Sequence, residues 1–503
     1  MAEVNTTVFA VSFAAYTLAI VLVGLYSARY ARRSDTDYFL ANRSLGPWIA
    51  SLSASASSES GWVTLGLVGW AYSSGVSAYW IIPGCLLGFA FNWFVLAARI
   101  RDRAGALDAL TIPDLFALHY RERTPVLRVL SVLVILVAMT LYVAAQFAAA
   151  GKAFEATFAL NYRVGVLIGA GIVLVYTVTG GFRAVCWTDF LQALLMVGTL
   201  VFFPIYLLAT HGGFGVVTDR LESISPELLE VIPQSAQASS AALIGFLLGS
   251  GALGINLGYP GQPHVLVRFM ALRDRREAFF GGVIAMTWGA LVYWGAVTVG
   301  LVARSLSVEG LEWTAALEAE GGGELGLVVT AANLLPELIS GVVLAAVLAA
   351  ICSTADSQLV VAASAAANDL VARLRRDRVS EAVQALVNRA TVLLLGVLAV
   401  ALVVNEEVEV YGYVLEYGWA ILGAAFGPQI ILMTLWRRST WAGCVVGMVT
   451  GFTVALVWKR GFDNTLGEVE VYNLTLGFVA AFIANVAVSL VTAPPGSGAS
   501  SEA

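Results

Sequence analysis

The polar residues that could do chemistry are concentrated in two interruptions of otherwise apolar stretches. In the first, Ser51-Leu-Ser-Ala-Ser-Ala-Ser-Ser-Glu-Ser-Gly61, seven of the eleven residues are serine or glycine. A helix broken at this point frees backbone carbonyls that can coordinate a cation, and unwound backbone at membrane depth must line a cavity or be buried in protein. Glu59 lies within it, and a carboxylate in a membrane is costly and usually functional. The pattern favours a cation or solute site over the alternative that the small residues only pack helices closely.

The second interruption is Gly258-Tyr-Pro-Gly-Gln-Pro-His264, where two prolines remove backbone donors and end a helix. The positive end of a half-helix starting there would attract a carboxylate. Tyr142 and Gln146 lie one helical turn apart in an earlier stretch and can face the same cavity. The candidate solute contacts from these patterns are Tyr259, Gln262, Tyr142 and Gln146, whereas His264 is interpreted as a packing or hydrogen-bonding residue.

A third polar cluster follows in Ala349-Ala-Ile-Cys-Ser-Thr-Ala-Asp-Ser357. Ala350, Ser353 and Thr354 share one helix face, and two hydroxyls with a carbonyl form an oxygen set that suits a hard cation rather than a transition metal. Alternatively, the hydroxyls bond only to carbonyls of their own helix. Asp356 and Ser357 extend the cluster and favour the cation site.

Asp189 opens another apolar helix after Thr179-Gly-Gly-Phe-Arg-Ala-Val-Cys-Trp-Thr. A carboxylate there can cap the free N–H groups of the helix. The other interpretation is a second cation site, with Asp189 joined by Ser353, Asp356 and Ser357. The residues leave both interpretations open.

Composition assigns the chain to membrane proteins. It has 503 residues, of which 59% are hydrophobic and 12% charged, with mean hydropathy +0.82; soluble proteins carry about 25% charged residues. Because a helix needs roughly 20 apolar residues to cross a bilayer, the sequence predicts an all-α polytopic protein with about thirteen spans. They are 7–29, 46–75, 77–99, 125–150, 163–182, 187–209, 240–268, 278–303, 336–366, 386–404, 410–435, 440–458 and 471–492.

Positive charge predicts the orientation of these spans, since cytoplasmic loops are enriched in lysine and arginine. With the N-terminus outside and the C-terminus in the cytoplasm, all but six of the 28 basic residues fall on the cytoplasmic side, Arg268 among them. The six exceptions are Lys152, Arg163, Arg220, Arg304, Lys459 and Arg460. We expect a multi-pass protein of the plasma (inner) membrane, without a cleaved signal peptide.

The two interruptions occupy matching places, five spans apart. Interrupted helices at corresponding positions of two halves are typical of inverted-repeat transporters that bind solute at the membrane midplane. The expected organisation is a single transporter domain, 1–503, with a five-plus-five core. Residues 46–209 form the first repeat and 240–435 the second, while 7–29 and 440–492 supply one and two accessory helices.

In this order, the motifs resemble the sodium:solute symporter family, and within it the branch that carries proline. The resemblance covers nearly the whole chain. Its landmarks are Asp37-Tyr-Phe-Leu-Ala-Asn-Arg-Ser-Leu-Gly46, Leu52-Ser-Ala with Ser60-Gly-Trp62, Thr111-Ile-Pro-Asp114, Gly180-Gly-Phe-Arg-Ala-Val-Cys-Trp-Thr-Asp189, Gly258-Tyr-Pro-Gly-Gln-Pro-His264 with Arg268-Phe-Met-Ala271, and Ser353-Thr354.

The resemblance implies specific sites. A sodium ion would be bound by the backbone carbonyls of Ala56 and Glu59 together with Ala350, Ser353 and Thr354. A second sodium, where the family uses one, would lie near Asp189, Ser353 and Ser357. The solute region would include Ser60, Gly61, Trp62, Tyr142, Tyr259 and Pro263. The chain departs from the proline branch at Ser58, where an aspartate is customary, at Glu59, at Gln146 and at Ile255.

These observations predict a secondary transporter rather than an enzyme: a sodium-coupled symporter for L-proline that works by alternating access. Sodium is the co-transported ion, and membrane lipid is the surrounding solvent; no nucleic acid and no obligate protein partner are expected. No G-x-x-x-x-G-K-[ST] motif occurs, which argues against ATP-driven pumping. The alternatives are a sodium symporter for another amino acid, a compatible solute or a monocarboxylate, a proton-coupled carrier, and a membrane sensor with a transporter fold.

Overall fold

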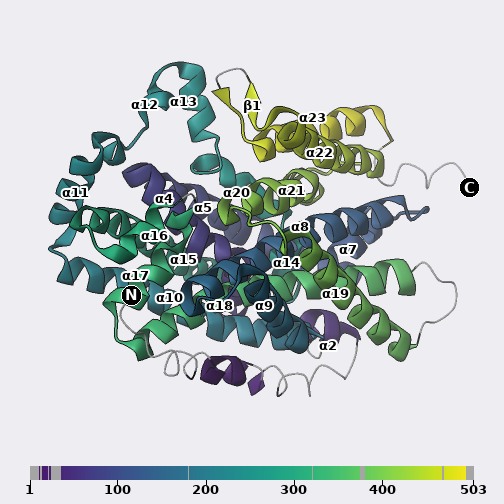
Figure 1. Ribbon diagram of the computed structural model, residues 1–503. Coiled ribbons are helices and arrows are strands. Elements are labelled where there is room, and N and C mark those ends of the chain that lie inside the picture. Colours follow the sequence, from purple (N-terminus) through teal and green to yellow (C-terminus); the bar gives the residue numbers. More distant parts are fainter. Residues whose placement is uncertain are drawn as a thin grey trace, which may run out of the picture.

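The chain folds into a bundle of helices, which we describe from a computed structural model (Figure 1). The structure describes residues 35–178, 181–319, 321–373, 380–466 and 469–493, together with scattered positions between 11 and 26. Within that part of the chain the strands are β1 (Thr465–Leu466) and β2 (Val469–Glu470), which form one antiparallel hairpin. The predicted all-α class is therefore confirmed.

The first predicted break interrupts a helix. α3 (Pro47–Ser58) starts with Pro47, since proline suits the first helical position. It ends because Glu59 leaves the helical region, with φ −100° and ψ 77°. The chain then resumes as a π-helical turn, Trp62–Leu67, which continues into α4 (Val68–Ser74). The glutamate thus lies between two helical halves.

A sharp bend at Gly75 separates this interrupted helix from the next span. Gly75 has a φ of +67°, and a β-carbon there would lie 2.1 Å from the carbonyl oxygen of Leu228, so only glycine fits. The chain then continues through Gly75–Trp80 (3-10), α5 (Ile81–Ala90), Phe91–Ala97 (π-helical) and α6 (Ala98–Leu107).

The second predicted break is also present. After α13 (Ser240–Leu247), a 3-10 segment, Leu253–Gly261, is followed by α14 (Pro263–Met270). Gln262 between them is extended, with φ −95° and ψ 100°, and the proline that follows has no N–H to donate to a preceding turn. The second interruption therefore arises from local chemistry that the sequence displays.

Long helices complete the bundle. α18 (Glu337–Ala365) continues as a π-helical turn, Ala366–Ala372. α20 (Val410–Tyr413) leads through a π-helical turn, Val414–Trp419, into α21 (Ala420–Leu435). The long helices are α8 (Val126–Phe158), α9 (Tyr162–Thr177), α10 (Phe182–Thr210), α15 (Glu277–Leu306), α18 (Glu337–Ala365), α19 (Glu381–Val403), α21 (Ala420–Leu435), α22 (Trp441–Phe462) and α23 (Asn473–Val491).

Nine helices in the described part of the chain are long and apolar enough to cross a membrane, so the predicted count of thirteen is not confirmed. The predicted span 7–29 falls largely outside the described residues. Two predicted spans form the continuous helical run Trp62–Leu107, the interrupted span 240–268 contains no long helix, and the apolar part of α9 is shorter than the others. The physical reason is twofold. A break divides an apolar stretch into helices too short to cross a membrane, and a helical run that continues through a bend joins two apolar stretches into one.

Short helices connect the long ones. α7 is capped by Thr111, whose hydroxyl accepts a hydrogen bond from the Asp114 N–H, and α2 is held to the start of α10 by an ion pair of 2.6 Å between Asp37 and Arg183. The short helices are α2 (Asp35–Leu40), α7 (Ile112–His119), α11 (Gly213–Ile224), α12 (Gln234–Gln237), α16 (Ala315–Glu318) and α17 (Gly326–Leu334).

Burial separates the centre of the bundle from its lipid-facing rim. α22 and α23 lie against each other at one edge (Figure 1), and α19 exposes Leu394 and Val397 while α23 exposes Ile483, as expected for helices in contact with lipid. In contrast, α18 is buried along nearly its whole length. α3 and α10 pack beside α18, and the serines of α3 are buried together with Thr188, Asp189 and Gln192 of α10.

Candidate functional site

The C-terminal end of α3 meets the middle of α18 in a cluster of oxygen atoms. The hydroxyl of Ser353 lies 2.9 Å from the carbonyl oxygen of Ala56 and 3.1 Å from that of Ala350. The hydroxyl of Thr354 lies 3.0 Å from the carbonyl oxygen of Ser57 and 3.4 Å from that of Ala56. All five residues are buried. The structure therefore brings together Ala56, Ala350, Ser353 and Thr354 as predicted, and adds Ser57.

The break in α3 explains why this cluster suits a cation. Because α3 ends at Ser58, the carbonyls of Ala56 and Ser57 lack the N–H partners that a continuing helix would supply. They also form the negative end of the helix dipole. A small hard cation prefers such oxygen ligands, so the arrangement can bind an ion without an acidic side chain.

Predicted solute residues gather on the other side of the same break. Glu59 is fully buried, and its Oε1 accepts hydrogen bonds from the Ser58 hydroxyl (2.9 Å) and the Tyr259 hydroxyl (3.1 Å). The hydroxyl of Tyr259 also lies 3.0 Å from that of Tyr293. The Oε2 atom of Glu59 has no hydrogen-bond partner among the described residues. A buried carboxylate oxygen in this state is available to a cationic group of a ligand.

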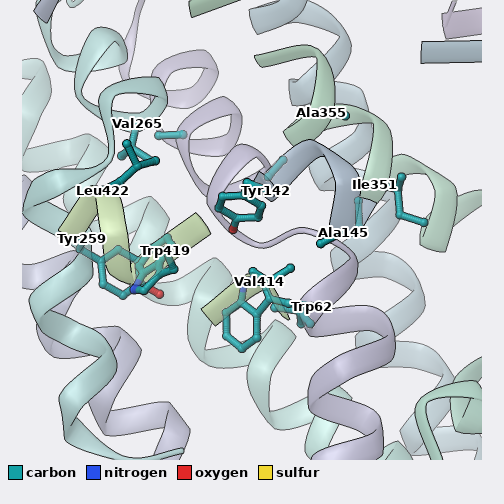
Figure 2. Close-up of a cluster of buried hydrophobic side chains, with 14 of the residues drawn as sticks. Trp62, Tyr142, Ala145, Tyr259, Val265, Ile351, Ala355, Val414, Trp419 and Leu422 are labelled. Atoms are coloured by element: carbon teal, nitrogen blue, oxygen red, sulfur yellow. The ribbon is translucent and has the colours of Figure 1, made fainter. Parts of the chain in front are cut away.

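Aromatic side chains pack around Tyr259, which donates a hydrogen bond to this carboxylate. Trp62, Tyr142, Tyr259 and Trp419 belong to one buried cluster drawn in Figure 2, and the rings of Tyr259 and Trp419 meet edge to face with centroids 4.6 Å apart. The indole N–H of Trp62 donates to the Ser58 carbonyl at 3.0 Å. Aromatic walls with few polar groups are typical of small-molecule sites.

Two glutamine side chains, Gln146 and Gln262, make hydrogen bonds to the backbone at the two breaks. The Gln146 Oε1 atom accepts a 3.0 Å hydrogen bond from the N–H of Gly61. The side-chain amide of Gln262 donates to the carbonyls of Gly258 (3.1 Å) and Trp419 (3.2 Å). Gly258 is required here, because a β-carbon would lie 1.9 Å from the indole nitrogen of Trp419. Ser60 and Pro263, also predicted, are buried beside these residues.

The predicted second cation site contains an arginine. Asp189 and Ser357 lie together as predicted, with 3.3 Å between the serine hydroxyl and Oδ2, and Asp356 is buried next to Ser357 on α18. The guanidinium of Arg268 donates to both groups, at 2.9 Å and 2.5 Å. Sequence reasoning missed Arg268, which it counted with the basic loop residues. The available signal was its position between the apolar runs Val265–Val267 and Phe269–Met270 of α14.

Helix α8 carries one ion-pair cluster near each of its ends, roughly 36 Å apart at 1.5 Å per residue. At one end, Arg128 pairs with Asp114 at 2.9 Å and also with Asp369, which accepts a 2.6 Å hydrogen bond from Thr111. Near the other end, Lys152 pairs with Glu324 at 2.6 Å.

The carboxylate of Glu324 also accepts hydrogen bonds from the backbone N–H groups of Val410 (2.8 Å) and Tyr411 (3.0 Å). Tyr142 and Gln146 lie on α8 between its two charged ends, and both are fully buried. Both predicted solute residues of α8 are thus removed from solvent. Sequence reasoning did not pair these charges.

Comparison with known proteins identifies the family. The family model of the sodium:solute symporter family matches residues 38–451. This chain belongs to that family. It is 36% identical over 491 residues to the sodium/proline symporter of Escherichia coli (strain K12), covering 97% of this chain and 94% of the relative. It is 33% identical over 489 residues to an osmoregulated proline transporter of Bacillus subtilis (strain 168), covering 96% and 95%.

A solved structure shares the fold. The chain is similar to a Na⁺-coupled sialic acid symporter in a substrate-bound outward-open state, with a TM-score of 0.78 and 18% sequence identity, over 97% of this chain and 98% of the other. Family membership confirms that the protein is a membrane-embedded, multi-pass transporter and not an enzyme, and that sodium is its coupling ion. The resemblance inferred from the motifs is confirmed as well.

Proposed function

We propose that this protein is a secondary symporter that uses a sodium gradient to import L-proline. The observation that carries the proposal is the oxygen cluster between α3 and α18, which lies one turn from a buried aromatic site around Glu59. Relatives that match nearly the full length are named for sodium and proline, which supports both the ion and the solute.

We assign sodium to the carbonyls of Ala56 and Glu59 with Ala350, Ser353 and Thr354. In the ion-bound protein, the two hydroxyls would turn their oxygen atoms toward sodium instead of donating to the carbonyls of Ala56 and Ser57. Binding the ion would therefore hold the end of α3 against α18. Because α3 ends at the solute site, an ordered end of α3 also prepares that site for solute, which is the coupling that symport requires.

We assign the solute to the buried region formed by Ser58, Ser60, Gly61, Trp62, Tyr142, Gln146, Tyr259, Gln262 and Pro263. The carboxylate of proline would bind at the N–H groups that open the second half of the interrupted helix, starting with Gly61. Its secondary ammonium would face Glu59, whose Oε2 has no hydrogen-bond partner among the described residues. The apolar ring would pack against Trp62 and Tyr142.

A second candidate is a different small zwitterion, such as another amino acid or a compatible solute. The observation in its favour is that Glu59 and Gln146 both contact the first break, where sodium/proline symporters customarily have other residues. Charge and volume at these two positions would decide which zwitterion fits.

Transport would proceed by alternating access within two inverted repeats, 46–209 and 240–435. We propose that the Lys152 end of α8 faces outside and the Arg128 end faces the cytoplasm, in the plasma (inner) membrane, with the N-terminus outside. This orientation follows the distribution of basic residues. The ion pairs at the two ends would open in turn.

The test is uptake of labelled proline into proteoliposomes under an imposed sodium gradient, compared with a potassium gradient. We expect uptake only with sodium, and inhibition by unlabelled proline but not by glutamate. Sodium-driven uptake of another zwitterion that excess proline does not inhibit would replace proline with the second candidate. Uptake that is indifferent to sodium would refute the coupling.

A further inference from the structure

The side chain of Arg268 ends inside a cage of oxygen atoms contributed by three helices. Its Nη2 atom lies 2.9 Å from Oδ2 of Asp189 on α10, 3.0 Å from the Ser57 hydroxyl on α3 and 2.5 Å from the Ser357 hydroxyl on α18. Its Nε atom lies 3.1 Å from the Ser53 hydroxyl. The arginine and aspartate side chains are both 0% exposed.

The same oxygen atoms would otherwise suit a small cation. The hydroxyls of Ser53 and Ser57 lie 2.8 Å and 3.0 Å from Oδ2 of Asp189, and those of Ser57 and Ser357 are 2.9 Å apart. One carboxylate with three hydroxyls is an all-oxygen set of the kind that hard cations prefer. A second cation site, with Asp189 joined by Ser353, Asp356 and Ser357, is one of the two interpretations that the sequence leaves open for Asp189.

We propose that the guanidinium of Arg268 is the resident cation of this site and that it excludes a second sodium ion. A guanidinium keeps its charge at physiological pH, and Nη2 occupies the position from which a cation would contact all three helices. A sodium ion added beside it would bring two positive charges together out of water, where their repulsion is strong. The symporter therefore binds one sodium, at the α3–α18 site. This inference deepens the proposed function and rests on it.

The position of Arg268 also connects the two interrupted helices. The residue belongs to α14, the second half of one, and contacts Ser53 and Ser57 in the first half of the other. Ser57 in turn supplies a carbonyl to Thr354 in the sodium cluster. The guanidinium of Arg268 thus holds α3, α10 and α18 to α14. Without it, a second bound ion would have to hold α3, α10 and α18 together.

The test counts sodium ions bound per polypeptide with ²²Na⁺ on the purified protein, which requires no knowledge of the solute. We expect one ion for the natural chain and two for R268Q, because glutamine removes the charge and leaves an oxygen in the cage. The double variant R268Q/D189N, which lacks the carboxylate, should return to one. R273Q is the matched control, since Arg273 lies on the same side of the bundle with its side chain 63% exposed, and should bind one.

Two sodium ions in the natural chain would overturn the proposal, for example if an ion bound between Oδ1 of Asp189 and Asp356 while Arg268 stayed in place. A folded R268Q that still binds one ion would also overturn it. If R268Q does not fold, the sodium-to-solute ratio of the natural chain, measured from its reversal potential, decides between one and two. No sodium bound at all would instead refute sodium coupling, and so the proposed function.

Discussion

The side-chain oxygen of Gln146 accepts a hydrogen bond of 3.0 Å from the N–H of Gly61, the residue at which the first interrupted helix resumes. Under the proposed function, this N–H receives the carboxylate of the solute. The amide of Gln146 and the carboxylate of the solute therefore compete for one N–H donor. When no solute is bound, the amide oxygen takes the place of the carboxylate.

Replacing Gln146 with a residue that cannot accept this hydrogen bond should strengthen solute binding. In Q146A the Gly61 N–H is free for the carboxylate, and a hydrogen bond of about 0.5–1.5 kcal/mol corresponds to a roughly two- to tenfold lower KM for uptake. T140A is the control, because the hydroxyl of Thr140 on the same helix donates to the carbonyl of Leu136. A higher KM in Q146A would mean that the amide contacts the solute directly.

The hydroxyls of the oxygen cluster should set sodium affinity. S353A and T354A each remove one ligand, and losing a hydrogen bond or ligand to a charged group costs about 1.5–3 kcal/mol, a roughly ten- to hundredfold rise in half-saturating sodium. The measurement is the sodium dependence of uptake at saturating solute. S340A, in the first turns of α18 with its hydroxyl on Ala331, should leave that dependence unchanged.

The carboxylate of Glu59 should recognise the ammonium of the solute and not the ion. E59Q keeps an oxygen for Ser58 and Tyr259 but removes the charge, so we expect a KM about ten- to a hundredfold higher with sodium dependence retained. Loss of sodium dependence would place the side chain among the ion ligands. A change in pH dependence instead would support the proton-coupled alternative.

The Lys152–Glu324 pair should stabilise the packing of α8 against the 3-10 turn Gly322–Leu325. K152M leaves a buried carboxylate without its cation, which costs a few kcal/mol, so the melting temperature should fall clearly. The double variant K152M/E324Q should recover part of this loss. R220M is the control, since Arg220 and Glu309 are partly exposed and such pairs contribute about 0–1 kcal/mol. Equal losses in K152M and R220M would contradict this role.

Labelling with a membrane-impermeant thiol reagent should reveal the orientation. The native cysteines, Cys85, Cys186, Cys352 and Cys444, are all buried, so background reaction should be low. In intact cells we expect Q237C to react, whereas D274C should react only after the membrane is permeabilised. Both native side chains are exposed, and the predicted topology places them on opposite sides of the membrane. The reverse pattern would invert the proposed orientation.

Local chemistry by itself determined the class of protein and the places where its helices break. Apolar length requires membrane helices, Pro263 has no N–H to donate to a preceding turn, and the hydroxyls three and four residues after Ala350 share a helix face with it. These properties depend only on neighbouring residues, so the breaks, the hydroxyl pair Ser353–Thr354 and the family landmarks follow from the sequence alone. The number of long helices does not follow from the sequence alone, because breaks divide some apolar stretches and continuous helical runs join others.

Tertiary structure alone decided which distant charges meet. Arg268 and Asp189 are 79 residues apart, Lys152 and Glu324 are 172 apart, and Arg128 and Asp369 are 241 apart. A sequence shows that each side chain is charged, but its direction around the helix and the helix that it faces depend on packing between elements. Counting positive charges therefore placed Arg268 with the loop residues, whereas packing turned it into the interior, onto the oxygen atoms of the predicted second sodium site.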